Sequence, residues 1–192
     1  MNELLYIKRN TKWQLLILLM LGTVFIACKK DPKTPVSTKA PVITTFYLIR
    51  HAEKDRSNPE NNDPELTQDG LGRAMLWANV FDTLQLDAIY STDYKRTRMT
   101  AAPASVKHNI EIQLYNPNTI DTKQLLKENF GGNVLIVGHS NTTPALANKL
   151  IGKEKYEPMS DDNNGNIYIV KLADSTGQVA QTRVEYVQAY QN

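Results

Sequence analysis

The stretch Ile43–His51 has the sequence ITTFYLIRH, in which β-branched, aromatic and aliphatic residues run directly into an arginine and a histidine. Runs of this composition predict buried β-strands. A second apolar run, Asn133–Val137, is followed directly by Gly138-His139-Ser140. Two predicted strands therefore each end at a histidine, and we expect these two ends to matter for function.

The sequence between and after these strands alternates between helical and strand patterns. Apolar residues recur at helical spacing from Leu71 to Leu84, and Thr67 is suited to cap the helix that contains them. The other predicted elements are a strand over 86–90, a helix to about Lys107 that breaks or kinks at Pro103, a short strand over 111–114, helices over 122–130 and 144–151, and an antiparallel strand pair over 167–172 and 182–187. Strands that alternate with helices predict a three-layer α/β/α sandwich with a mostly parallel central sheet.

Composition and charge exclude several classes of protein. The chain has 192 residues, 41% of them hydrophobic and 22% charged, which is typical of a globular protein. Its formal charge of +2 equals that of the first 27 residues alone, with three basic groups and one acid, and the part from residue 41 onward is net acidic. A nucleic-acid-binding surface is therefore not expected. The single cysteine, Cys28, allows neither an intrachain disulfide nor a cysteine-based zinc site.

The N-terminus has the pattern of an export signal. Basic residues precede the apolar run Leu15–Ala27, which is shorter than the ~20 residues that span a bilayer. The run ends in Phe25-Ile26-Ala27-Cys28, which resembles the lipobox of bacterial lipoproteins, in which the cysteine is acylated. An uncleaved membrane anchor, or a secretory signal with an incidental cysteine, are the alternatives.

These features predict three parts of the chain. Residues 1–27 form a lipoprotein signal peptide, residues 28–41 a flexible tether rich in Lys, Pro, Ser and Thr, and residues 42–192 the folded domain. We expect an exported protein, lipid-anchored through Cys28 to the bacterial cell envelope on its periplasmic or surface side.

Four polar side chains are expected to meet at one edge of the sheet. Arg50, His51 and His139 end two strands, and Arg96 follows the strand end at Tyr90-Ser91-Thr92. Ligands of open α/β sheets bind at the carboxyl ends of strands. Two guanidinium groups and two imidazoles suit a phosphoryl group, because arginine binds phosphate oxygens bidentately and stays charged. A metal site of His51, His139 and Glu53 is the alternative, but arginines close by would oppose a cation.

The motifs around these residues resemble the histidine phosphatase superfamily, which has the phosphoglycerate mutase-like fold. Four stretches carry the resemblance, in the order of the family: Leu48–Lys54, Leu66–Ala74, Ser91–Ala101 and Val134–Asn141. The resemblance implies that His51 attacks phosphorus and forms a phosphohistidine, while Arg50, Arg96 and His139 hold the phosphoryl oxygens. Ser140 and Asn141 are expected to contact the substrate, and neither a metal nor an organic cofactor is implied.

The resemblance leaves the general acid open. Ser140 follows His139 where larger acid phosphatases of the superfamily have aspartate, so the acid must come from elsewhere. Asp121, in a loop that could reach the cleft, is preferred over Glu53. The acidic loops over 53–65 and 156–166 are expected to border the cleft and to disfavour polyanions.

These observations predict a metal-independent phosphatase. Its expected substrate is a small phosphomonoester, a phosphopeptide or a phosphoramidate. A non-catalytic envelope lipoprotein that binds phosphorylated ligands is the alternative. A mutase-type phosphotransferase is less favoured, because the short domain leaves few residues to cover the pocket and exclude water.

Overall fold

A computed structural model describes residues 40–174 and 177–187, with side chains. The predicted signal peptide, Cys28 and the tether up to residue 39 lie outside these residues, so their predictions stay open. Within the described ranges, no helix is long and apolar enough to cross a membrane.

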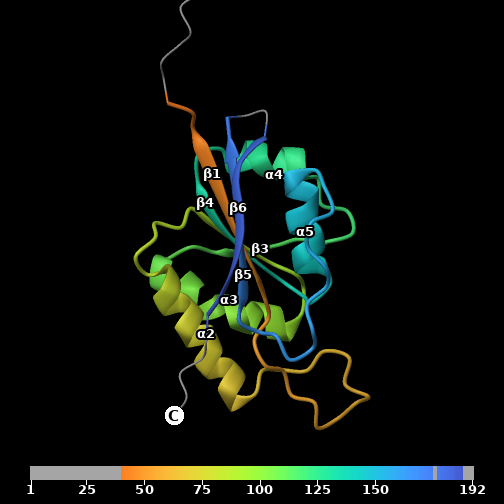
Figure 1. The fold of residues 1–192 in the computed structure, drawn as a ribbon. Coiled ribbons are helices and arrows are strands. Elements are labelled where there is room, and N and C mark those ends of the chain that lie inside the picture. Colours follow the sequence, from red (N-terminus) through yellow and green to blue (C-terminus); the bar gives the residue numbers. More distant parts are fainter. Residues whose placement is uncertain (1–39, 175–176, 188–192) are drawn as a thin grey trace, which may run out of the picture. The chain divides into compact units, whose positions relative to one another are not determined.

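Strands and helices alternate along the described chain (Figure 1). The elements are β1 (Ile43–Arg50), α2 (Gln68–Phe81), β2 (Ala88–Ser91), α3 (Lys95–His108), β3 (Ile112–Leu114), α4 (Thr122–Glu128), β4 (Asn133–Gly138), α5 (Thr142–Ile151), β5 (Asn166–Ala173) and β6 (Gln178–Tyr186). The strands form one sheet in the order β3-β2-β4-β1-β5-β6. β3, β2, β4 and β1 pair in parallel, while β5 is antiparallel to both β1 and β6. The predicted α/β/α sandwich with a mostly parallel sheet is confirmed.

Each face of the sheet is covered by a pair of helices, α4 and α5 on one face and α2 and α3 on the other (Figure 1). Successive residues of a strand point to opposite faces. Phe46 and Leu48 accordingly pack toward α4 and α5, whereas Tyr47 and Ile49 pack toward α2 and α3. Burial on both faces explains why β1 is an unbroken apolar run and does not alternate with polar residues.

Helix α3 is continuous at Pro103. The sequence predicts a break or kink there, and the predicted break is wrong, because α3 runs as one element from Lys95 to His108. The missing N–H of proline removes one helical hydrogen bond, and the remainder of the helix is retained by packing. Its buried residues Ala101 and Ala104 contact the sheet on either side of the proline.

The register of the strands brings their carboxyl ends to one level. Arg50 of β1 lies beside Gly138 of β4, and Ser91 of β2 lies beside Val137 of β4. The residues that follow these strands therefore start from neighbouring points on the same edge. The two histidine-bearing strands, β1 and β4, are neighbours in the sheet, which is the condition for their side chains to meet.

Candidate active site

A pocket of about 650 Å³ lies at this edge of the sheet. It is lined by Arg50, His51, Arg96, His139, Ser140 and Asn141, which are six of the residues predicted for the site. Four segments that follow the parallel strands β1, β2, β3 and β4 contribute to it, as expected for a ligand site at the carboxyl ends of strands. The structure therefore brings the predicted histidines and arginines together.

His51 is buried, with 4% of its surface exposed. Its Nδ1 lies 2.7 Å from the carbonyl oxygen of Ala52, and a carbonyl only accepts, so Nδ1 carries the proton. The side-chain amide of Asn164 donates to the carbonyl oxygen of His51 at 2.8 Å and fixes the backbone there. In the neutral ring, Nε2 then carries the lone pair, and no described residue forms a hydrogen bond with it.

Burial lowers the pKa of His51 to about 3, because a charged imidazole loses its hydration there. The hydrogen bond to Ala52 opposes this shift, and the positive charges of Arg50 and Arg96 add to it. His51 is therefore neutral near pH 7, which keeps its lone pair available for attack.

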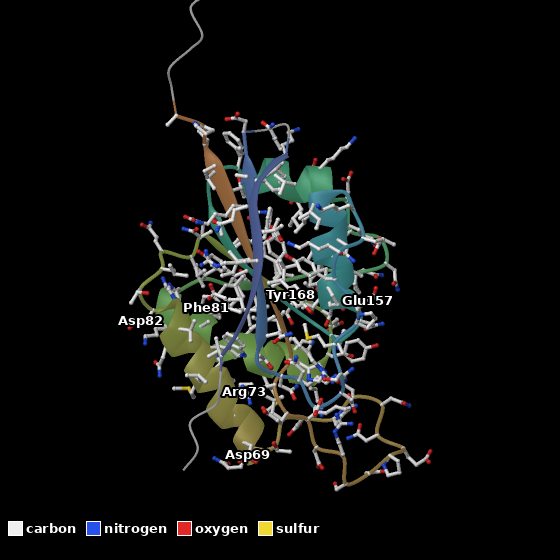
Figure 2. The ribbon with its side chains drawn as sticks, in the orientation of Figure 1. Asp69, Arg73, Phe81, Asp82, Glu157 and Tyr168 are labelled. Atoms are coloured by element: carbon white, nitrogen blue, oxygen red, sulfur yellow. The ribbon has the colours of Figure 1, made fainter. Side chains whose placement is uncertain are left out.

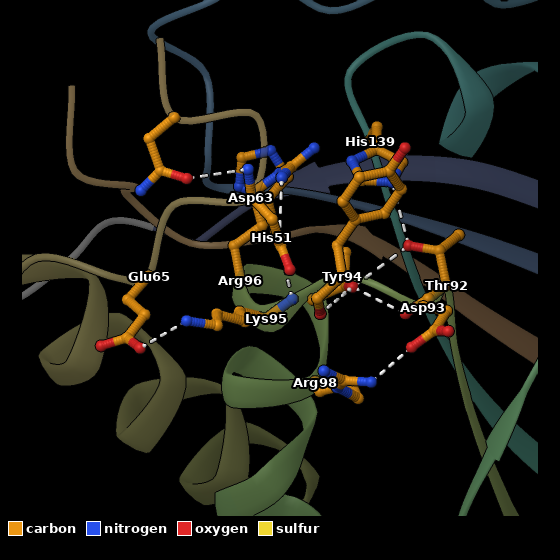
Figure 3. A network of polar contacts seen from close by, with 12 residues as sticks. His51, Asp63, Glu65, Thr92, Asp93, Tyr94, Lys95, Arg96, Arg98 and His139 are labelled. Atoms are coloured by element: carbon orange, nitrogen blue, oxygen red, sulfur yellow. Dashed lines mark hydrogen bonds and ion pairs between the residues drawn. The ribbon is translucent and has the colours of Figure 1, made fainter. Parts of the chain in front are cut away.

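His139 lies beside His51, with 5.5 Å between the ring centroids. Its Nε2 is 2.9 Å from Thr92 Oγ1, which is itself 3.1 Å from Thr97 Oγ1 (Figure 3). The ring of Tyr94 packs edge-on against that of His139, with 5.0 Å between centroids. Burial lowers the pKa of His139 to about 4, and Arg96 contributes to the shift. These contacts fix the orientation of the second imidazole.

Arg50 is 2% exposed and holds the segment before β5 against the pocket. Its Nη1 lies 2.9–3.2 Å from the carbonyl oxygens of Ser160, Asp161 and Asn163. Its Nη2 donates to Asp161 Oδ1 at 2.8 Å, and this carboxylate also pairs with Arg56 at 2.7 Å. Hydrogen bonds from Arg56 and Arg50 lower the pKa of Asp161 to about 2. Arg50 Nε is buried and has no partner among the described residues.

Arg96 approaches the pocket from the first turn of α3. Its guanidinium lies over the ring of Tyr94, 4.3 Å from the centroid, and Nη1 lies 3.5 Å from Asp63 Oδ1 (Figure 3). Arg96 Nε and Nη1 have no hydrogen-bond partner among the described residues. Burial lowers the pKa of Arg96, but an arginine stays charged at any physiological pH. Unpartnered buried N–H groups of two arginines are suited to the oxygens of an anion.

The glycine before His139 leaves room for a cluster of hydroxyl groups. A Cβ at Gly138 would lie 2.8 Å from Thr143 Oγ1 and 2.9 Å from Tyr115 Oη, closer than such contacts normally allow. The Tyr115 hydroxyl is buried without a partner, and burial raises its pKa. Only glycine fits here without displacing the pocket wall next to His139.

Neither predicted acid reaches the pocket. Glu53 pairs through Oε1 with Arg73 Nε at 2.7 Å, where Arg73 is the α2 side chain labelled in Figure 2. Asp121 caps α4, accepting hydrogen bonds from the backbone N–H groups of Lys123 and Gln124 at 2.8 and 3.3 Å. Both carboxylates thus have structural partners, and the pocket is lined without them.

Several lining residues were not assigned a role from the sequence. They are Lys54, Thr92, Asp93, Tyr94, Tyr115, Asn116, Pro117, Asn118, Thr142 and Asp161. Asp161 belongs to the predicted acidic border, and Lys54 stands three residues after His51. The acidic border itself is neutralised in part, since Asp161 pairs with Arg50 and Arg56 and Asp63 lies at Arg96.

The neutral state of His51 predicts that acid destabilises the fold. The unfolded residue titrates near pH 6.5 and the folded one near 3, so between these values the unfolded chain binds more protons. The free energy of unfolding should therefore fall as pH drops from 6.5, by at most about 1.4 kcal/mol per pH unit from this group. Urea titrations at pH 7, 5.5 and 4.5 measure the slope, and His51→Asn should flatten it. An equal slope in the variant would contradict the assignment.

Comparisons with known proteins agree with this site. The sequence profile of the histidine phosphatase superfamily (branch 1) matches residues 46–116, which contain Arg50, His51 and Arg96. Phosphoserine phosphatase 1 of Hydrogenobacter thermophilus is 36% identical over 72 residues, 35% of this chain. The match spans about a third (34%) of that relative's length.

Solved structures share the fold over most of the chain. The protein histidine phosphatase SixA, in complex with tungstate, is 16% identical with a TM-score of 0.59, covering 74% of this chain and 96% of its own. YhfR of Bacillus stearothermophilus is 18% identical with a TM-score of 0.59, and the match covers 76% of this chain and 98% of YhfR. A mycobacterial glucosyl-3-phosphoglycerate phosphatase is 15% identical with a TM-score of 0.58, and the match covers 77% of this chain and 100% of that enzyme. At these identities the likeness concerns the fold.

The profile match covers the first histidine and both arginines. His139 lies outside the matched residues. It follows β4, which lies between β2 and β1 in the sheet, and its ring centroid is 5.5 Å from that of His51. The chain is thus similar to the histidine phosphatase superfamily in the segment that carries the first histidine and both arginines, and it shares its fold with the solved structures described above.

Proposed function

We propose that this protein is a phosphatase that forms a phosphohistidine at Nε2 of His51. One observation carries the proposal. A neutral imidazole with its Nε2 lone pair free lies in one pocket with two arginines that have unpartnered buried N–H groups. A neutral nucleophile beside fixed positive charge is the arrangement that phosphoryl transfer needs.

The proposed reaction has two displacements at phosphorus. In the first, the Nε2 lone pair forms a P–N bond, the bond from phosphorus to the leaving group breaks, and the leaving group takes up a proton. In the second, water attacks phosphorus, the P–N bond breaks, and inorganic phosphate leaves as His51 becomes neutral again. Arg50, Arg96 and His139 would stabilise the charge on the phosphoryl oxygens in both steps.

The pocket favours substrates whose leaving group needs little help from an acid. Asp93 and Asp161 are the carboxylates that line it, and each is held in an ion pair, with Arg98 and with Arg50 and Arg56. Hydrogen bonds from Arg56 and Arg50 lower the pKa of Asp161 to about 2, so this carboxylate stays ionised and is a poor proton donor. Phosphoramidates and aryl phosphates have leaving groups that depart without a strong acid, so they are the proposed substrate classes. The partial match to a phosphoserine phosphatase keeps alkyl phosphomonoesters within the proposal.

The same pocket supports a second candidate, a non-catalytic receptor for phosphorylated ligands. The observation in its favour is the paired state of both pocket carboxylates. A mutase-type phosphotransferase is less favoured, because the pocket has no unpaired carboxylate to return a proton to a retained substrate.

For its place in the cell, we propose export and lipid anchoring at Cys28 to the cell envelope. The order of features at the N-terminus supports this proposal: basic residues, then an apolar run, then a sequence that resembles a lipobox. Because acyl chains would hold the domain at a membrane, its substrates would be small phosphorylated compounds or phosphopeptides of the envelope.

Hydrolysis of p-nitrophenyl phosphate tests the proposed activity. We expect the purified protein to release p-nitrophenol in the presence of EDTA, because every group assigned to the reaction is a side chain of this chain. Activity lost on chelation and restored by a divalent cation would contradict the metal-free mechanism. A folded protein without activity between pH 4 and 8, but stabilised against heat by inorganic phosphate, would favour the receptor.

A further inference from the structure

Lys54 lines the pocket but has no role in the reaction proposed above. It is half-buried, and its ammonium group has no ion pair or hydrogen bond with another described residue. Both acids that line the pocket with Lys54 have other cations as partners. Asp161 pairs with Arg50 and Arg56, and Asp93 pairs with Arg98.

Two acids of the loop after His51, Asp63 and Glu65, also have cations as partners. Asp63 accepts from the backbone N–H of Lys95 at 2.9 Å and lies near Arg96, while Glu65 pairs with Lys95 at 3.1 Å (Figure 3). The acidic border that the sequence predicts is therefore compensated in part, at the acids closest to the pocket. Both carboxylates that line the pocket are paired, while Lys54 has no acidic partner among the described residues.

Lys54 lies close enough to the other cations for electrostatic repulsion between them. Burial, followed by the charges of Arg96 and Arg56, lowers its pKa, with Asp161 opposing the shift. Lys54 in turn contributes to the lowered pKa of His139. These positive charges lie in one pocket and repel one another. The pocket therefore favours a ligand that carries a second negative group in addition to its phosphoryl group.

The pocket has room for a ligand larger than phosphate. A phosphoryl group fills the space of only a few water molecules, about 30 Å³ each, whereas the pocket measures about 650 Å³. Other lining residues, such as Asn116, Asn118 and Ser140, are uncharged. They can hydrogen-bond to the rest of a substrate without competing for an anion.

We propose that Lys54 binds a second anionic group, a carboxylate or a further phosphate, on the same small molecule whose phosphoryl group faces His51. This inference rests on the proposed function, because it assumes a phosphoryl group at His51. It makes Lys54 a specificity-determining residue and selects phosphorylated acids over neutral phosphomonoesters. It reverses the expectation that acidic loops make the pocket unfavourable to polyanions.

Binding of two matched ligands tests this role, with no need for turnover. Phosphoglycolate carries a carboxylate next to its phosphate ester, and ethyl phosphate has the same short chain without one. Calorimetry should show that the full-length protein binds phosphoglycolate more tightly. In Lys54→Met this preference should fall by about tenfold. Lys54→Arg should restore it, and Lys54→Gln gives a second neutral side chain should the methionine variant not fold.

Two results would overturn the inference. One is an absence of preference for phosphoglycolate in the unaltered protein. The other is an equal loss of affinity for both ligands in Lys54→Met, because the lysine would then bind the shared phosphoryl group. Turnover of both compounds, measured as phosphate release, is followed separately. A preference in binding without any turnover would remove the proposed phosphatase activity and leave the role of Lys54 intact.

Discussion

His51→Asn should lower kcat/KM for p-nitrophenyl phosphate by about 10³-fold or more, the scale on which loss of a nucleophile acts. The imidazole is the group that forms the covalent bond in the proposed mechanism, so an amide of similar polarity cannot replace it. Arg50, Arg96 and His139 would still bind the phosphoryl group. The variant should therefore retain affinity for inorganic phosphate while it loses turnover.

The control for this variant is His108→Asn. His108 is the last residue of α3 and does not line the pocket. The same chemical change there should alter kcat/KM less than threefold. If both variants retain activity, another residue is the nucleophile. If both lose it together, a loss of folding is the cause, which a thermal unfolding curve of each detects.

Quenching with an alkaline denaturant during turnover distinguishes the covalent mechanism from direct attack by water. A phosphohistidine is labile in acid and stable in base, in contrast to a phosphoserine. Radiolabelled substrate should leave base-stable label on the unaltered protein and none on His51→Asn. Label that survives in the variant would place the intermediate on a different residue.

The positions of the reactive residues could be predicted because each follows a strand with a strong local signal. β1 and β4 are buried on both faces, and each is an unbroken apolar run. The carboxyl end of each strand can therefore be located in the sequence. That the two strands are neighbours depends on long-range pairing, such as Arg50 beside Gly138, which no local pattern encodes. From the sequence this adjacency is only a condition for the site to form, and the register of β1 and β4 meets it.

The two predicted acids illustrate a different limit. Asp121 had a local signal for its structural role, because Asp121-Thr122-Lys123-Gln124 resembles a capping box at a helix start. The prediction for Asp121 rests only on a loop that could reach the cleft and does not use this signal. Glu53 had no such signal, because its partner Arg73 lies 20 residues away on α2. A charge near a motif predicts chemistry only once its ion-pair partners are known.

Lys54 was missed for the same reason. Its importance arises from the pairing of its acidic neighbours with Lys95, Arg56 and Arg98. Counting charges along the loop suggests an acidic border, whereas in three dimensions the acids that line the pocket are paired and Lys54 is not. Net charge of a segment is thus a poor guide to the field in a pocket.

Gly70→Ala should be the most damaging of the conservative substitutions near the site. A Cβ at Gly70 would lie 2.1 Å from the carbonyl oxygen of Glu53, so either α2 or the loop after His51 must move. That carbonyl also accepts from the backbone N–H of Thr67 at 2.9 Å, and Thr67 caps the helix by accepting from Gly70 N–H. Overpacking of this kind costs about 1–3 kcal/mol or more.

Gly72→Ala, two residues further along α2, is the matched control. A Cβ there meets nothing within 4 Å, so the higher helix propensity of alanine should stabilise the protein by about 0.5–1 kcal/mol. Chemical denaturation of both variants measures the opposite signs. Because Glu53 lies between His51 and Lys54, the movement forced by Gly70→Ala should also reduce turnover, while Gly72→Ala leaves it unchanged. Equal stability of the two variants would show that α2 does not press on the loop that carries the nucleophile.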